Sequence, residues 1–106
     1  MRALGRIAAP QSNPAIIEVL KDPEPEVREW AARALGAIGS PQSVDPLLAT
    51  LDDETPEVRE WVVRALGEIG DPRATESLIG MLDDENEEVR YWAARALGNI
   101  KTGGEE

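Results

Sequence analysis

The chain has 106 residues and a formal net charge of −10 at pH 7, and a surface of that sign repels the phosphate backbone of nucleic acids. It contains no His and no Cys, which removes the commonest general base, thiolate chemistry, disulfides and Cys-based metal sites. The composition therefore predicts a protein that is not an enzyme, that uses no cofactor or metal and that does not bind nucleic acid.

The acidic charge itself has two explanations, and both stay open. It attracts a basic or Arg-bearing protein partner over long range, or it simply keeps the protein in solution. No charged and then apolar leader begins the chain, and no apolar run approaches the length of about 18 residues that spans a membrane. We expect no membrane contact and a cytoplasmic location.

A long segment recurs along the chain at a fixed step of 31 residues, as Val27, Val58 and Val89 show. A period between about 20 and 50 residues is typical of stacked repeat proteins. Residues 1–9 match the end of this segment, so we expect them to be the end of a long helix. A shorter helix is predicted from about Asn13 to Lys21, with one apolar face made of Ile16, Ile17 and Leu20.

The next helix is predicted to begin at Pro25, because a proline at the first helical position loses no hydrogen bond. Gly39 ends it, since glycine readily adopts the left-handed conformation. Between these two ends, apolar residues recur at helical spacing and form the predicted buried stripe, namely Val27, Ala31, Ala34, Leu35 and Ile38.

Ser40 and Pro41 restart the chain as a cap and a first-turn proline. Thr55 is the predicted cap of the following long helix. Between them lies a shorter helix, which we expect to turn inward Val44, Leu47, Leu48 and Leu51.

The second unit repeats this scheme. Its long helix runs to Ile69 and stops at Gly70, and its shorter helix restarts at Asp71 and turns inward Leu78, Ile79 and Leu82. A third long helix follows Asn86 and ends near Ile100, and residues 101–106 form a polar tail.

Short turns between helices make neighbouring helices antiparallel, so we predict an all-α fold of about seven helices in one domain. Its units are a partial repeat at 1–21, repeats at 22–52 and 53–83, a partial repeat at 84–100, and the tail. The units differ at two places. Asn13 and Thr75 stand at the apolar position of Val44, and a Val62–Val63 pair replaces the Ala–Ala pair of the first unit.

Two residue pairs are repeated in each of the three predicted long helices from Pro25 onward. They are the Val-Arg pairs Val27-Arg28, Val58-Arg59 and Val89-Arg90, and the Leu-Gly pairs Leu35-Gly36, Leu66-Gly67 and Leu97-Gly98. With these pairs the chain resembles the HEAT-like repeats named after phycobilisome lyases, and it is similar to the regularised repeats of artificial alpha-repeat binding proteins. The resemblance implies a right-handed α-solenoid, an armadillo-like superhelix whose long helices line the concave side.

Beside the buried stripe, each long helix carries a second stripe of a Glu, a Trp and an Arg about one turn apart. Stacking turns these residues into columns, namely Glu26, Glu57 and Glu88; Trp30, Trp61 and Trp92; and Arg33, Arg64 and Arg95. The resemblance implies that these positions are exposed on the concave face, with Tyr91 beside them. We predict that they bind a protein or peptide partner, because Trp and Arg are enriched at interface hot spots.

An alternative role for these residues is structural. The Trp rings pack between units, and the Arg residues pair with Glu29 and Glu60 on the preceding turn; the two roles are compatible. For Arg28, Arg59 and Arg90 the resemblance implies a structural role, in which each Arg pairs with an acid of a neighbouring inter-helix turn, the candidates being Asp22, Asp53 and Asp84.

The acidic turns Asp52–Glu54 and Asp83–Glu85 lack the alternating ligands and the glycine of a calcium loop. They precede helix N-termini, where the helix dipole favours negative charge. We therefore predict a role at the helix ends and no metal site.

The function predicted from these observations is a non-enzymatic scaffold for a protein or peptide partner. Two alternatives stay open: an accessory factor or lyase-like subunit for chromophore attachment, and an engineered or fragment array without a natural ligand. Because the last long helix has no shorter partner, we also expect Leu97 and Ile100 to be exposed and the terminal units to associate into a homo-oligomer.

Overall fold

The computed structural model describes residues 14–100, which contain no strand. The predicted helix end at residues 1–9 and the predicted tail at 101–106 lie outside this range. Residues 14–19 are helical. The further elements are α2 (Pro25–Ile38), η1 (Pro41–Ser43), α3 (Val44–Leu48), α4 (Pro56–Ile69), η2 (Pro72–Ala74), α5 (Thr75–Gly80), η3 (Met81–Asp83) and α6 (Glu87–Asn99).

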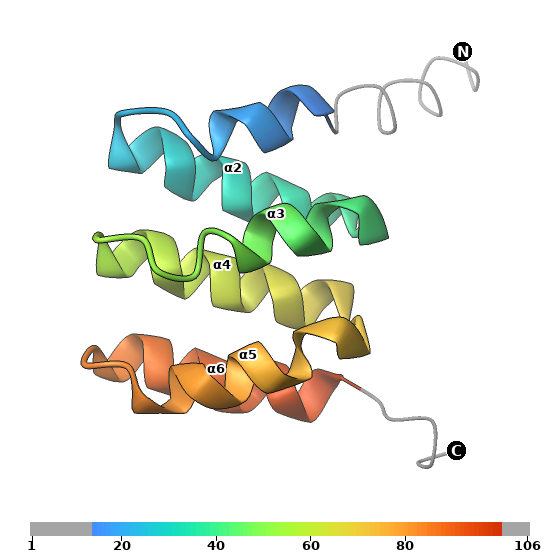
Figure 1. The fold of residues 1–106 in the computed structure, drawn as a ribbon, viewed down its shortest axis with the longest axis vertical. Coiled ribbons are helices and arrows are strands. Elements are labelled where there is room, and N and C mark those ends of the chain that lie inside the picture. The colour runs from blue at the N-terminus through green and yellow to red at the C-terminus, as the bar shows by residue number, and fades with distance from the viewer. Residues whose placement is uncertain (1–13, 101–106) are drawn as a thin grey trace.

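The helices form two layers, as Figure 1 shows. The long helices α2, α4 and α6 lie side by side in one layer, and the shorter helices α3 and α5 lie in front of them. In this layer α2 packs against α4, and α4 packs against α6. The prediction of an all-α stack of helix pairs is therefore confirmed.

The helix boundaries follow from local chemistry. Pro25 and Pro56 begin α2 and α4, and Gly39 and Gly70 end them in the left-handed conformation with φ of 74° and 73°. At the start of α6, the Asn86 side chain accepts hydrogen bonds from the backbone N–H groups of the first turn.

The prediction that Thr55 caps α4 holds for its position and not for its side chain. Thr55 occupies the N-cap position of α4, but its side chain makes no capping hydrogen bond. Instead, Asp53 Oδ1 accepts the Thr55 N–H at 2.9 Å. The same turn recurs before α2, where Asp22 accepts the N–H of Glu24, and before α6, where Asp84 accepts that of Asn86. A repeated aspartate therefore shapes the chain before each long helix.

The core lies between the two layers and is continuous through the units. Its largest fully buried side chains are Leu35, Leu47, Leu66, Leu78, Val44, Val58, Val62, Val63 and Val89. In the predicted stripe of α2, Val27, Ala34 and Ile38 are only half-buried, whereas Ala32 and Gly36 are buried. In α4 the equivalent Val58 and Ala65 are buried, because α4 packs between α2 and α6, whereas among the described residues α2 has a long helix on one side.

Two predictions about apolar exposure are wrong. Ile79 and Leu82 are 52% and 37% exposed, because no described element covers the outer edge of α5 and η3. The equivalent Leu48 and Leu51 are half-buried in the stack. Ile100, expected to be exposed, is buried in the core, and Leu97 is half-buried against it.

The long helices touch at glycine. A Cβ atom added to Gly36 would lie 2.8 Å from Ala65 Cα, and one added to Gly67 would lie 2.8 Å from Ala96 Cα. Both distances are shorter than real Cβ contacts, so the glycines permit the close approach of one long helix to the next. Gly98 has open space around it among the described residues.

We predict that Gly67→Ala lowers the free energy of unfolding by about 1–3 kcal/mol, because the added methyl group forces α4 and α6 apart. Gly98→Ala is the matched control. It adds the same methyl group where nothing opposes it, and the better helix propensity of alanine should leave stability unchanged or raise it by up to about 1 kcal/mol. Chemical denaturation measures both, and equal effects of the two substitutions would contradict the packing role.

A second prediction concerns Ser43, which is fully buried and whose Oγ has no hydrogen-bond partner among residues 14–100. One repeat later the same position is Ala74, also fully buried. A buried hydroxyl without a partner costs about 1–3 kcal/mol. Ser43→Ala should therefore raise the free energy of unfolding by about 1 kcal/mol, and a destabilised variant would show that the hydroxyl is satisfied in solution.

Candidate interaction site on the long helices

The three tryptophans occupy equivalent positions on α2, α4 and α6, yet they differ in exposure. Trp61 and Trp92 are half-buried and pack against the core, whereas Trp30 is 55% exposed. Trp61 and Trp92 therefore contribute to packing between units, as the structural alternative predicts. Trp30 presents more than half of its surface to solvent, and the binding role stays a prediction.

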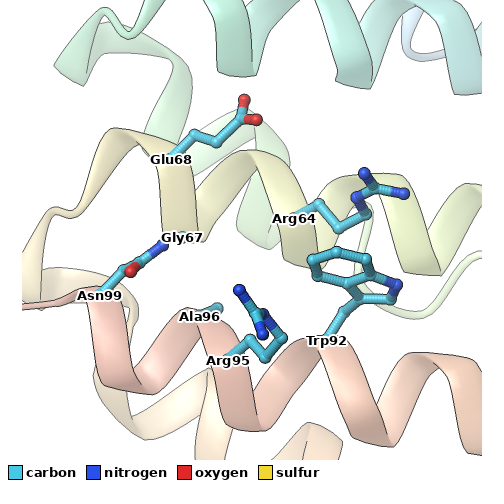
Figure 2. A pocket seen from close by; sticks show the side chains of 7 residues that line it. All are labelled: Arg64, Gly67, Glu68, Trp92, Arg95, Ala96 and Asn99. Carbon is cyan, nitrogen blue, oxygen red and sulfur yellow. The ribbon is translucent and has the colours of Figure 1, made fainter.

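Arg64 connects the two half-buried rings. Its guanidinium carbon lies 3.8 Å from the ring centroid of Trp61 on the same helix, and 3.9 Å from that of Trp92 on α6. Figure 2 shows the Arg64 side chain above the Trp92 indole, between α4 and α6. The cation thus lies between two aromatic faces and is only 28% exposed, an arrangement in which cation–π attraction is stronger than at an open surface.

Longer contacts extend this arrangement at both ends. Arg33 of α2 lies 5.0 Å from the Trp61 centroid, and Arg95 of α6 lies 5.6 Å from that of Trp92. The result is an alternating column, the Arg–Trp ladder, made of Arg33, Trp61, Arg64, Trp92 and Arg95. Stacked units thus place the Arg of one helix on the Trp of the next.

Tyr91 lies at the end of the ladder and is 53% exposed. Its ring meets that of Trp92 edge-on at 5.2 Å, and its hydroxyl accepts a 3.4 Å hydrogen bond from Arg95. Because an edge-on pair leaves one ring face open, Tyr91 offers contact area to solvent.

Carboxylates border the ladder. Glu60 pairs with Arg64 one turn away at 3.4 Å, and burial raises the pKa of Glu60 although the Arg64 charge opposes this. The analogous pair of Glu29 with Arg33 is not formed among the ion pairs of residues 14–100. The predicted site residues Glu26, Glu57 and Glu88 are all exposed, on the N-terminal turns of the three long helices.

The described part of the long helices has hollows on its surface. A hollow of about 110 Å³ lies between α4 and α6 beside Arg64 and Trp92 (Figure 2). Another, of about 190 Å³, is lined by Glu26, Glu29, Trp30 and Arg33. A third, of about 230 Å³, is lined by Glu87, Glu88 and Tyr91.

A wider hollow of about 440 Å³ lies elsewhere, between the helix at 14–19 and α3. Its lining includes Ile17, Leu20, Pro46 and Thr50. None of the predicted site residues contributes to it, and it carries neither Trp nor Arg.

Arg28 and Arg59 occupy the other flank of the long helices and join consecutive units. Arg28 makes a bidentate ion pair with Asp53 at 2.7 and 3.1 Å, and Arg59 makes the same pair with Asp84 at 2.9 and 3.1 Å. All four side chains are nearly buried. The hydrogen bond to Asp53 raises the pKa of Arg28 above its ordinary value.

Each of these arginines also donates to a backbone carbonyl of its own turn, Arg28 to Asp22 and Arg59 to Asp53. The aspartate that shapes one turn is thus also the partner of the preceding arginine. Arg90 donates to the Asp84 carbonyl at 2.7 Å, and within residues 14–100 it has no carboxylate partner.

One inter-unit contact was missed by the sequence analysis. Arg73 donates to the Pro41 carbonyl at 2.9 Å and lies 3.6 Å from Asp45, while its hydrogen bonds to Asp71 lower the pKa of that carboxyl. Its equivalent in the first unit is Gln42, so the repeat pattern held no signal for this contact.

Within residues 14–100, no helix has the length and apolar character needed to cross a membrane.

Comparison with known proteins supports the repeat assignment. The family model described as HEAT repeats matches residues 1–56 and 44–106. The family model describes HEAT repeats in general, so the phycobilisome lyase type that the sequence suggested is not confirmed. No curated protein matches the chain.

Two solved structures are similar to it. Human deoxyhypusine hydroxylase in complex with glycerol superposes with a TM-score of 0.78 at 26% identity over 84% of this chain, which spans 32% of the hydroxylase. The crystal structure of an engineered protein superposes with a TM-score of 0.69 at 27% identity over 84% of this chain and 45% of its own. The chain thus corresponds to less than half of either protein.

The ladder geometry makes a prediction about stability. Arg64→Ala should lower the free energy of unfolding by about 2 kcal/mol, because it removes the cation between two half-buried rings. It should also expose both indoles to water and shift tryptophan fluorescence to longer wavelength.

Arg95→Ala is the control, since Arg95 is exposed and lies farther from any ring. Its effect should stay within about 0.5 kcal/mol. Similar losses for the two variants, or an unchanged emission maximum for Arg64→Ala, would mean that the stacked cation contributes nothing.

Proposed function

Because the chain belongs to the HEAT repeat family, we propose that it is a non-enzymatic scaffold whose long-helix face binds a protein or peptide partner. HEAT repeats generally mediate protein interactions. Composition supports the absence of catalysis, since the chain has neither His nor Cys. This chain spans only 32% of the hydroxylase that it resembles, so we do not carry that enzyme's reaction over.

The observation that carries the proposal is the exposure of aromatic rings on the long-helix face. Trp30 and Tyr91 are 55% and 53% exposed at opposite ends of the Arg–Trp ladder. Large rings and arginines are the side chains that contribute most to interface affinity. A partner lying across the three long helices would cover both rings and the ladder between them.

The acidic charge favours a partner with basic groups and disfavours nucleic acid. The absence of membrane contact and the cytoplasmic location remain predictions from sequence alone. Self-association also remains a prediction, and the residues it would now involve are the exposed Ile79 of α5 and Leu82 of η3.

A peptide-display selection against the chain tests the proposal, with the bound surface mapped by NMR chemical-shift changes. We expect bound peptides to shift resonances of α2, α4 and α6. The double variant Trp30→Ala/Tyr91→Ala should weaken binding by about tenfold or more, because both rings are exposed contacts.

The matched control is Gln42→Ala/Glu76→Ala, which truncates two exposed side chains of η1 and α5 on the short-helix side. It should change the affinity less than about twofold, the size of an ordinary surface effect. Selection of no binding peptide, or of peptides that map to the hollow between residues 14–19 and α3, would contradict the proposal.

A further inference from the structure

We infer that Trp30, together with Glu26 and Glu29, forms a subsite for an arginine side chain of the partner. The inference rests on the proposed function and adds the chemistry of the partner's anchoring group. Three observations lead to it: the open face of Trp30, the carboxylates around it, and a second copy of the same arrangement that is already filled by an arginine of the chain itself.

The filled copy lies one repeat later. There Trp61 binds the Arg64 guanidinium at 3.8 Å, and Glu60 neutralises that guanidinium at 3.4 Å. Glu29 and Trp30 are the equivalents of Glu60 and Trp61 in the first unit. The structure therefore shows, within one chain, that this pair of residue types holds a guanidinium group.

The first unit has the same residue types but leaves its ring open. Arg33, the equivalent of Arg64, extends to Trp61 at 5.0 Å and does not stack on Trp30. Among residues 14–100 no cation lies over the Trp30 ring, which is 55% exposed. In the part of the chain that the structure describes, the ring face that Trp61 uses for Arg64 is thus uncovered in Trp30.

The hollow beside Trp30 has room for a small cationic group. Its volume is about 190 Å³, several times the roughly 30 Å³ that a water molecule occupies in the liquid. The charged groups that line it are the carboxylates of Glu26 and Glu29 and the guanidinium of Arg33. Since Arg33 is directed to the next unit's ring, the two carboxylates govern the charge of the hollow.

These groups select among ligands. An anion would be repelled by the two carboxylates, and a neutral apolar group would leave them without a partner. A guanidinium satisfies both features, because it stacks flat on an indole and donates hydrogen bonds to carboxylates in its own plane. The net charge of −10 further favours a cationic partner at long range.

A direct test uses N-acetyl-arginine methylamide as the probe and the indole N–H signals of the three tryptophans in NMR as the readout. We expect a saturable shift of the Trp30 signal, with smaller shifts for Trp61 and Trp92. The citrulline analogue has the same shape without the charge and should give no saturable shift.

Two variants make the assignment specific. Glu26→Gln/Glu29→Gln keeps the ring and removes the charges, and it should weaken the probe by about threefold or more. Glu76→Gln is the control, since it removes an exposed carboxylate from α5 in the layer of short helices, and it should leave the response to the probe unchanged. Equal responses to arginine and citrulline, or a larger shift of Trp61 or Trp92 than of Trp30, would overturn the inference.

The selected peptides separate this inference from the proposed function. Replacing their arginines with citrulline should reduce the affinity for the unmodified chain by about threefold or more, and should have little effect on the Trp30→Ala variant. Peptides that bind the long-helix face without needing a cation would overturn the subsite and leave the proposed function standing. A probe that shifts Trp30 while no peptide binds would uphold the subsite and count against the proposed function.

Discussion

The structure depends on the close approach of its long helices at glycine. Gly36 lies against Ala65 and Gly67 lies against Ala96, with no room for a side chain between them. This contact fixes the spacing and the relative rotation of consecutive units. The ion pairs of Arg28 with Asp53 and of Arg59 with Asp84 join consecutive units at this same spacing.

The Arg–Trp ladder follows from the same spacing. With the helices this close, Arg64 reaches the ring of its own unit and the ring of the next one, at 3.8 and 3.9 Å. The equivalent residues of the long helices thus form a continuous stack, in which the guanidinium groups and the rings of Trp61 and Trp92 contact one another. What the stack leaves open is its first described ring, Trp30, and the Tyr91 beside its last ring, so the surface offered to a partner lies at the two ends.

Much of the fold could be predicted from the sequence, because the fixed period indicates stacked units and places the helix ends at equivalent residues. The starts at Pro25 and Pro56 and the stops at Gly39 and Gly70 follow from residue chemistry alone. Ile79 shows the limit, since its burial depends on a neighbouring element and not on its own helix. The site shows it too. The repeat period makes Trp30, Trp61 and Trp92 equivalent, whereas Trp61 and Trp92 are half-buried beside a preceding long helix and Trp30 has no such helix among the described residues.

NMR of the Arg64 side chain in the unmodified chain tests the stacked arrangement most directly. This arrangement predicts nuclear Overhauser contacts from the Arg64 side-chain protons to the indoles of both Trp61 and Trp92. It also predicts upfield ring-current shifts of these protons relative to those of Arg33 and Arg95. Contacts to only one indole, or Arg64 shifts equal to those of the other two arginines, would contradict the stacked arrangement.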